Sequence, residues 1–341
     1  MPRRTLATLA VIAGCSAILA GGVIAPAGAA TPGVERISGA DRYAVSAAIS
    51  ANTFTGPDPV PIAYVVSGEV FSDALSASAL AGLRGGPVLL TTKNAVPEAV
   101  RTELSRIDPV KIIVLGGAAT ISDAVYQELR KLSPTVTRIG GADRFEVSAS
   151  AVHDYYSATT PRPAVPMSFV ASGANFPDAL SGAAAAGHLS GPVLLTSKDR
   201  LPDSVLTELK EEKPKSIRVL GGPNSVDQSV IDTLTSGVTT DTARVPGADR
   251  FAVSAKISET SFGERVPVVY IASGEVFPDA LSGSAAAIAK EAPVLLVTKS
   301  AIPGLIATEL QRLKPAKIVV LGGTNTIDAA VEAQLGGFVV K

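Results

Sequence analysis

The sequence contains no tryptophan, one cysteine (Cys15) and two histidines (His153 and His188) among its 341 residues. A single cysteine excludes a disulfide framework and a cysteine metal cluster. Two histidines cannot form a zinc site without help from carboxylates. The lack of tryptophan removes the best ring for stacking on sugars, which argues against a lectin built on aromatic platforms. We therefore predict no metal site and no cofactor.

An excess of charge of one sign is also missing, because 30 Lys and Arg residues face 31 Asp and Glu residues and the net charge is -1. No global field attracts nucleic acid or anionic lipid, so any anion site must be local. The composition is 46% hydrophobic and 18% charged, which is too apolar for a disordered chain. The length leaves room for two or three domains.

The N-terminus has the pattern of an export signal. Arg3 and Arg4 precede the apolar segment 6–24, and Ala27-Gly28-Ala29 matches an A-x-A cleavage site. We expect residues 1–30 to be a signal peptide and the protein to be secreted. Lipidation at Cys15 is the alternative, since residues 12–15 resemble a lipobox, but the apolar run continues past this cysteine. No second apolar run of about 18 residues follows, so no membrane span is expected in the mature protein.

Four sequence motifs recur three times in the same order: R-[IV]-x-G-A-D-R-[YF], S-G-x-x-F-x-D-A-L-S, P-V-L-L and L-G-G. In that order they begin at Arg36, Ser67, Pro87 and Leu115, then at Arg138, Ser172, Pro192 and Leu220, and then at Arg244, Ser273, Pro293 and Leu321. A repeat in fixed register predicts three copies of one structural unit. We place the copies at residues 34–137, 138–243 and 244–341.

Within each copy, short apolar runs alternate with stretches of helical length. In the first copy, residues 62–66, 88–90 and 112–115 are Val, Ile and Leu runs, as expected of strands buried on both faces. Helix-start signals follow at Asp73, Pro97 and Ser122. This alternation predicts parallel crossovers, and therefore three layered α/β, Rossmann-like repeats with mostly parallel sheets. The third copy ends where the others carry the strand leading to Arg138 or Arg244.

The second motif lies at the carboxyl end of a strand, where open α/β sheets bind ligands. Its aspartates fit the N-cap position of the following helix, its Ser-Gly pair fits a sharp turn, and its phenylalanine fits a contact with the core. The alternative is a polar contact to a ligand or to a neighbouring copy. The candidate residues are Ser67, Ser172 and Ser273 with Asp73, Asp178 and Asp279.

The G-A-D-R motif is more suggestive of binding. Its aspartates, Asp41, Asp143 and Asp249, also fit N-caps, and its arginines, Arg42, Arg144 and Arg250, then fall in the first helical turn. The helix macrodipole disfavours a cation there, so each arginine needs a partner. That partner is either a carboxylate in the same or the next copy, or an anionic ligand held by the guanidinium.

Catalytic patterns are weak. The L-G-G turns are neither G-x-G-x-x-G nor a Walker A loop, which argues against nucleotide binding. The repeated serines lack the glycine that precedes the serine of a nucleophile elbow, and no histidine recurs among the copies to act as base. We predict no catalytic residues. An enzyme would instead need an asymmetric site in one copy, around His153 or His188.

The four motifs, in this order and covering nearly the whole mature chain, resemble the cell wall binding repeat type 2 of Gram-positive surface proteins. The resemblance implies three Rossmann-like repeats packed with pseudo-threefold symmetry, and non-covalent anchoring to anionic secondary cell wall polymers. By the same resemblance, segments 87–90, 192–195 and 293–296 match the family's P-I-L-L element, associated with packing between repeats and with polymer attachment. Family members usually carry a separate effector domain, and from the sequence we expect none beside the three repeats.

The sequence therefore predicts a secreted, non-enzymatic protein associated with the cell wall and bound to a teichoic-acid-like or acidic polysaccharide. Three weak sites on one rigid body gain avidity for a polymer that repeats its charge. The predicted contacts are the three motif arginines, with the motif serines and the aspartates that follow them. The alternatives are an amidase-like cell-wall hydrolase and a structural surface-layer protein.

Overall fold

The computed structural model describes residues 31–158 and 162–340. The predicted signal peptide and Cys15 lie outside these residues. Among the described helices, none is long and apolar enough to cross a membrane.

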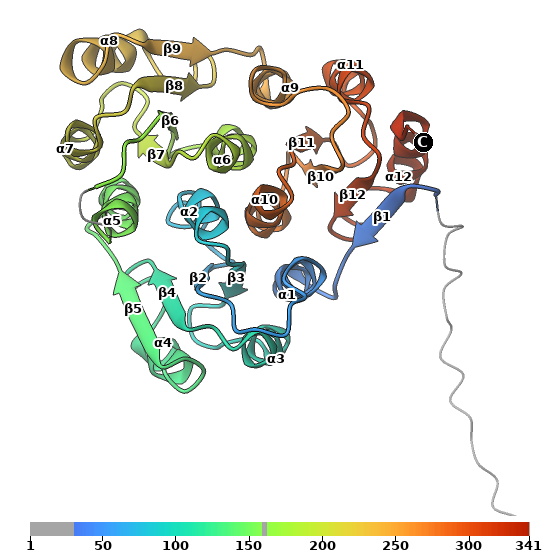
Figure 1. The fold of residues 1–341 in the computed structure, drawn as a ribbon, viewed down its shortest axis with the longest axis horizontal. Coiled ribbons are helices and arrows are strands. Elements are labelled where there is room, and N and C mark those ends of the chain that lie inside the picture. The colour runs from blue at the N-terminus through green and yellow to red at the C-terminus, as the bar shows by residue number, and fades with distance from the viewer. Residues whose placement is uncertain (1–30, 159–161, 341) are drawn as a thin grey trace, which may run out of the picture. The chain divides into compact units, whose positions relative to one another are not determined.

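The described chain forms three units, each with a four-stranded parallel sheet (Figure 1). The first sheet has the order β3-β2-β4-β5, with β2 (Ala63–Ser67), β3 (Val88–Thr91), β4 (Lys111–Leu115) and β5 (Thr135–Ile139). The second has the order β7-β6-β8-β9, with β6 (Met167–Ser172), β7 (Val193–Thr196), β8 (Ser216–Leu220) and β9 (Thr242–Val245). The third has the order β1-β12-β10-β11, with β1 (Val34–Ile37), β10 (Val269–Ser273), β11 (Val294–Val297) and β12 (Ile318–Leu321). The predicted fold class is confirmed.

The strands form where the sequence has runs of Val, Ile and Leu. Every residue of β2, β3, β10, β11 and β12 is buried. Strands covered on both faces need apolar side chains on both, which explains why the runs do not alternate with polar residues.

The third sheet is completed by the N-terminal strand. β1 pairs in parallel with β12, from Val34 opposite Ile318 to Ile37 opposite Leu321. The strand expected after the third copy is thus supplied by residues at the other end of the described chain. Likewise, β5 and β9, which lead into Arg144 and Arg250, complete the first and second sheets. The sequence copies and the sheets are therefore offset by one strand.

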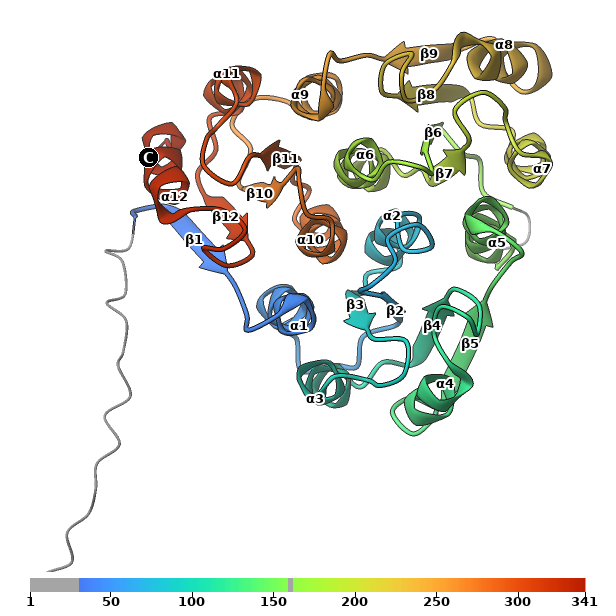
Figure 2. The same ribbon diagram turned by 180° about the vertical axis from the view of Figure 1, so that it is seen from behind.

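Each unit has four helices. They are α1 (Arg42–Thr53), α2 (Ala77–Leu83), α3 (Glu98–Ile107) and α4 (Asp123–Leu129); α5 (Arg144–Ser157), α6 (Pro177–His188), α7 (Asp203–Glu212) and α8 (Gln228–Gly237); and α9 (Arg250–Ser261), α10 (Pro278–Ala289), α11 (Gly304–Leu313) and α12 (Ala329–Leu335), which is followed by a 3₁₀ turn (Gly336–Phe338). The helices α2, α6 and α10 pack against one another at the centre, with the sheets around them (Figures 1 and 2).

Each G-A-D-R motif connects the edge strand of one sheet to the first helix of the next unit. We call these connections the first junction (β5 to α5), the second junction (β9 to α9) and the third junction (β1 to α1). The three junctions link the units into a closed arrangement, because the third connects the last sheet back to the first unit.

The central helices approach closely because they consist mainly of small residues. The serine hydroxyls of Ser78 and Ser284 donate across helices to the backbone oxygens of Leu281 and Leu180, at 2.8 and 3.0 Å. At the far end of the helices, Gly82, Gly187 and Ile288 occupy corresponding positions. A Cβ added at Gly82 or Gly187 would come within 2.6 or 2.4 Å of Ile288. One isoleucine thus fills the space left by two glycines.

This packing predicts the effect of Gly187→Val. The new side chain overlaps Ile288, so we expect the variant to lose about 1–3 kcal/mol of stability in denaturant unfolding. The exchange Gly187→Ile with Ile288→Gly moves the large side chain to a neighbouring helix and should recover most of the loss. The single change Ile288→Gly leaves a cavity and serves as the control. A double variant less stable than both Gly187→Val and Ile288→Gly would contradict the packing described.

Candidate binding pockets at the repeat junctions

The aspartates of the G-A-D-R motif are N-caps, as predicted. The Asp41 carboxylate accepts hydrogen bonds from the backbone N–H groups of Tyr43 and Ala44, at 3.0 and 2.8 Å. Asp143 and Asp249 cap α5 and α9 in the same way. The aspartate fixes the start of each helix, and the arginine after it is therefore held at the junction.

The arginines of the motif bridge neighbouring units. Arg42 Nη1 donates to the Gly68 carbonyl of the first unit at 2.6 Å, and its guanidinium lies over the Phe277 ring of the third unit, 5.9 Å from the centroid. Arg144 contacts the Gly173 carbonyl at 2.5 Å and the Phe71 ring at 6.0 Å. Arg250 contacts the Gly274 carbonyl and the Phe176 ring in the same way.

None of these three arginines forms a salt bridge with any residue that the structure describes, so the alternative of an internal ion pair is wrong. A backbone carbonyl and an aromatic ring take its place. Both partners suit a guanidinium, whose planar fork donates in plane while its face lies on a ring. Arg42 and Arg250 are exposed and Arg144 is half-buried, which leaves guanidinium surface for a ligand.

The phenylalanines of the second motif form a triangle between the units. The ring centroids of Phe71, Phe176 and Phe277 lie 5.6, 5.7 and 5.9 Å apart. The sequence indicated separate contacts with the core and missed this contact between copies. Each junction arginine lies over one ring of the triangle, so the three arginines surround it on the same face of the three units.

The aspartates of the second motif are not N-caps, contrary to prediction. The helices α6 and α10 begin at Pro177 and Pro278, one residue before the aspartates, because proline suits the first helical position. Asp178 and Asp279 therefore lie inside the first turn. In the first unit Ser72 replaces the proline, and α2 begins only at Ala77.

These aspartates instead lie beneath the L-G-G turns. Gly221 and Gly322 have φ of +97° and +96°, and a Cβ there would come within 2.4 and 2.2 Å of the Asp178 and Asp279 carboxylates. Only glycine combines this backbone conformation with such close approach. The D-A-L-S and L-G-G motifs recur together because they are in contact.

Burial raises the pKa of both Asp178 and Asp279 to about 6. For Asp178, a hydrogen bond with Ser225 and the charge of Arg250 work against this rise; for Asp279, the charge of Arg42 does so. Burial also raises the pKa of the half-buried Asp73, whose nearest arginine charge is Arg144. Each arginine thus acts on an aspartate across its junction.

Two junctions contain open pockets beside these groups. The second junction has a hollow of about 350 Å³, which includes Asp178, Asp249, Arg250 and Asn224. The third has a hollow of about 180 Å³, which includes Asp279, Asp41, Arg42 and Asn325. Sequence reasoning missed the two asparagines, because the first copy has Ala119 at that position.

The motif serines are turned inward. Ser67, Ser172 and Ser273 are at most 1% exposed. The Ser67 hydroxyl accepts from the backbone N–H groups of Glu69 and Val70, both at 3.1 Å, and Ser273 does the same with Glu275 and Val276. They fix the turn that carries the phenylalanine, and their contact with a polymer stays a prediction.

The P-V-L-L segments form the buried strands β3, β7 and β11. β3 packs against α10 of the third unit, and β11 packs against α6 of the second. These strands therefore contribute to packing between units, as the family resemblance implied.

The histidines of the middle copy have local partners. His153 Nδ1 lies 3.0 Å from Glu208 and 3.4 Å from Glu211, the kind of donor set that binds metals. The Arg162 guanidinium, 2.8 Å from Glu208 and 3.5 Å from Glu211, already neutralises this cluster. His188 stacks on Phe262, with ring centroids 4.5 Å apart.

The closed repeat fold and its matching junction pockets define a tandem-repeat α/β binding protein. The chain belongs to the cell wall binding domain 2 (CWB2) family, whose sequence model matches residues 36–126, 138–231 and 244–332. The resemblance seen in the motifs is thereby confirmed, and the chain is a cell-wall-binding protein in this general sense.

Known proteins agree with this assignment. The structures of Cwp6 and Cwp8 from Clostridium difficile, both 25% identical, superpose with TM-scores of 0.82 and 0.79 over 90% of this chain and 48% and 52% of theirs. An amidase enhancer of Bacillus subtilis is 28% identical over 88% of this chain. The N-acetylmuramoyl-L-alanine amidase LytC of the same species is 24% identical over 92%. The chain spans only 40% and 60% of the length of these two relatives.

The raised pKa of Asp279 predicts how its replacement changes stability with pH. A folded-state pKa of about 6, above the ordinary value of 3.8 for aspartate, gives stability that is present below pH 4 and lost as pH rises through 6. Asp279→Asn removes this loss, so its stability relative to the native protein should rise by about 2–3 kcal/mol between pH 4 and pH 7. Denaturant unfolding at both pH values measures it.

The exposed residue Asp199 supplies the control, since Asp199→Asn removes a carboxylate outside the junctions. A difference between Asp279→Asn and the native protein that stays constant from pH 4 to pH 7 would refute this assignment.

Proposed function

We propose that the chain is a secreted, non-enzymatic protein that holds an anionic cell wall polymer at its three junctions. The observation that carries this proposal is the threefold placement of Arg42, Arg144 and Arg250 around one aromatic triangle, each without a carboxylate salt bridge among the described residues. Each guanidinium keeps surface for an anionic group while its backbone carbonyl contact fixes its orientation.

The backbone adds to the attraction for anions. At the third junction, the first turns of α1 and α10 and the glycine turn before α12 meet at one pocket. Helix N-termini carry partial positive charge and unpaired N–H groups, which favour anions. Asp41 and Asp279 offset part of this charge, and protonation of Asp279 below pH 6 reduces the offset.

Multiplicity makes weak sites sufficient. Once one junction holds a phosphate or carboxylate of a polymer, the other two junctions meet further groups at roughly millimolar effective concentration. The rigid contact among α2, α6 and α10 keeps the three sites at fixed separation. A polymer that repeats its charge therefore gains avidity, whereas a single anion does not.

The non-enzymatic part of the proposal is supported by the symmetry of the junctions. Polar groups recur in all three copies, as suits repeated binding, and the asymmetric histidine His153 is engaged by Glu208, Glu211 and Arg162. Secretion is supported by the signal pattern of residues 1–30. A teichoic-acid-like or acidic polysaccharide is the polymer class that fits local cationic sites on a nearly neutral protein.

Sedimentation with isolated Gram-positive cell walls tests the proposal. We expect the purified protein to sediment with intact walls and to remain in solution when acid extraction has removed their anionic polymers. Retention should fall as ionic strength rises above about 0.15 M, where the screening length is about 8 Å. Equal retention on extracted walls, or release of muropeptides during incubation, would overturn the proposal.

Replacement of the junction arginines by glutamine tests the sites themselves. One replacement should weaken wall binding by about tenfold, and the triple variant R42Q/R144Q/R250Q by at least about a hundredfold, because avidity is lost together with the contacts. The triple change at the exposed cations Arg130, Lys131 and Lys210 removes the same charge outside the junctions. Thermal unfolding of each variant separates loss of binding from loss of fold.

If both triple variants lose the same affinity, binding follows net charge and the junctions are not the sites. The three Arg→Lys replacements add a second comparison, since lysine keeps the charge but not the planar fork.

A further inference from the structure

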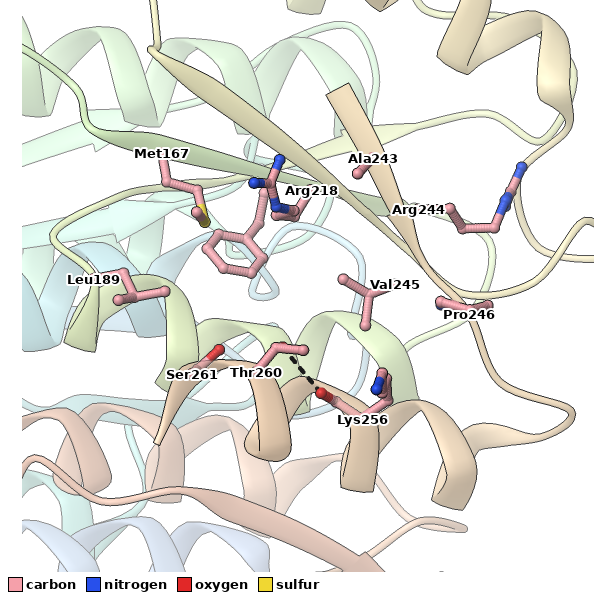
Figure 3. A pocket seen from close by; sticks show the side chains of 11 residues that line it. Met167, Leu189, Arg218, Ala243, Arg244, Val245, Pro246, Lys256, Thr260 and Ser261 are labelled. Carbon is pink, nitrogen blue, oxygen red and sulfur yellow. Dashed lines mark hydrogen bonds between the residues drawn. The ribbon is translucent and has the colours of Figure 1, made fainter. Parts of the chain in front are cut away.

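A second kind of pocket lies between the second sheet and α9, separate from the polar pocket at the start of that helix. It measures about 150 Å³, and Met167, Phe169, Leu189 and Val245 are among its lining residues. Figure 3 shows Leu189, Val245, Thr260 and Lys256 around it. Arg250 begins α9, whereas this hollow is lined by the later turns of the helix. We call it the α9 hollow.

The corresponding space at the first junction is filled. Arg84 donates to Asp154 at 2.9 Å and to the hydroxyl of Tyr64 at 3.3 Å, and its guanidinium lies 5.0 Å from the Tyr155 ring. Lys111 adds a further contact to Asp154 at 3.9 Å. These side chains tie the first sheet to α5.

The third junction is bridged as well. The Asn52 amide donates to Glu35 at 2.9 Å, and Lys317 forms a salt bridge with the same carboxylate.

The second junction lacks the side chains that bridge the first. By alignment of the copies, Leu189 stands where the first junction has Arg84, Thr260 where it has Asp154, and Ser261 where it has Tyr155. Leu189 and Ser261 are smaller than Arg84 and Tyr155, and together the three residues remove the charged bridge as well as the ring. The hollow is thus the space of the missing side chains.

The second junction has two cationic side chains that the other junctions lack at the same positions. Arg218, on the central strand β8, stands where the other copies have Ile113 and Val319. Lys256 stands where they have Ala48 and Ser150. Both line the α9 hollow. A cation in place of a buried aliphatic residue needs an anionic partner.

The acidic partners of these cations lie at the surface. Arg218 Nη1 lies 3.0 Å from Asp241, whose side chain is 60% exposed, and Lys256 lies 2.9 Å from Glu259, whose side chain is 51% exposed. Exposed pairs of this kind contribute little, so a ligand carboxylate can compete with them. Arg244 also lines the hollow, but its guanidinium donates to the Gly221 carbonyl and points away from Arg218 and Lys256 (Figure 3).

We propose that the α9 hollow binds a small aromatic carboxylate, with its ring against Met167, Phe169 and Leu189 and its carboxylate at Arg218 and Lys256. An apolar cavity of about 150 Å³ holds one benzene ring. The planar guanidinium of Arg218 matches a carboxylate in a bidentate geometry. This site is independent of the polymer contacts, because it shares no residue with the junction arginines.

Calorimetric titration of the purified protein with benzoate tests the site. We expect saturable binding of one benzoate per chain, and binding of benzyl alcohol at least tenfold weaker because it lacks the charge. Arg218→Ile and Lys256→Ala restore the residues of other copies and should each weaken benzoate binding by at least fivefold. Arg130→Gln removes a distant exposed cation and should leave it unchanged.

Ser261→Tyr fills the hollow with the side chain that the first junction has as Tyr155 and should abolish benzoate binding, whereas Ser261→Ala keeps the space and should preserve it. Absence of saturation, equal affinity for benzyl alcohol, or unchanged binding by both Arg218→Ile and a folded Ser261→Tyr variant would overturn the proposal. The Ser261→Tyr variant should still sediment with cell walls, and the R42Q/R144Q/R250Q variant should still bind benzoate. These two measurements distinguish failure of this proposal from failure of the proposed function.

Discussion

Each sheet of this protein is completed by a strand in which the first motif of the next copy begins. The clearest example is β1, whose backbone groups pair with those of β12 at the opposite end of the described chain. A parallel strand left unpaired at this edge would expose a row of N–H and C=O groups. Completion of the sheets therefore holds the three units together and sets where the junctions fall. The glycine-rich connections after β1, β5 and β9 must cross between units, and they bring the arginines with them.

The junction arginines connect stability to binding. Arg42 reaches a carbonyl of the first unit and a ring of the third, so its orientation depends on the same closure. This geometry explains why an arginine is tolerated in the first turn of α1. The helix end disfavours its charge, while the Gly68 carbonyl, the Phe277 ring and the charge of Asp279 favour it. A guanidinium held in this way is already oriented for a ligand, which lowers the entropy lost on binding.

The sequence predicted the parts of the fold that depend on local pattern. The strand runs, the three copies and the capping by Asp41, Asp143 and Asp249 all follow from residues near one another in the chain. The partners of Arg42, the triangle of Phe71, Phe176 and Phe277 and the pairing of β1 with β12 depend on contacts between copies, which periodicity does not encode. The N-cap prediction for Asp178 failed because the helix begins at Pro177, before this aspartate. The α9 hollow was equally hidden, since it arises from residues of the second sheet and of α9.

The three copies share the features that closure of the interface needs, and they differ elsewhere. Features present three times, such as the arginine with its glycine carbonyl, are needed at every junction because each junction closes the same interface.

The middle copy differs from the others at positions that closure does not constrain. Glu212, 4% exposed, stands where the other copies have Ile107 and Leu313, and burial raises its pKa to about 8, so it is mostly protonated at neutral pH. Arg218 likewise replaces an aliphatic residue. A buried carboxyl group and a cation in the wall of a cavity both cost stability. The closed interface tolerates these costs because the central helices and the completed sheets bury most of the apolar surface. One junction can therefore carry a pocket that the others lack.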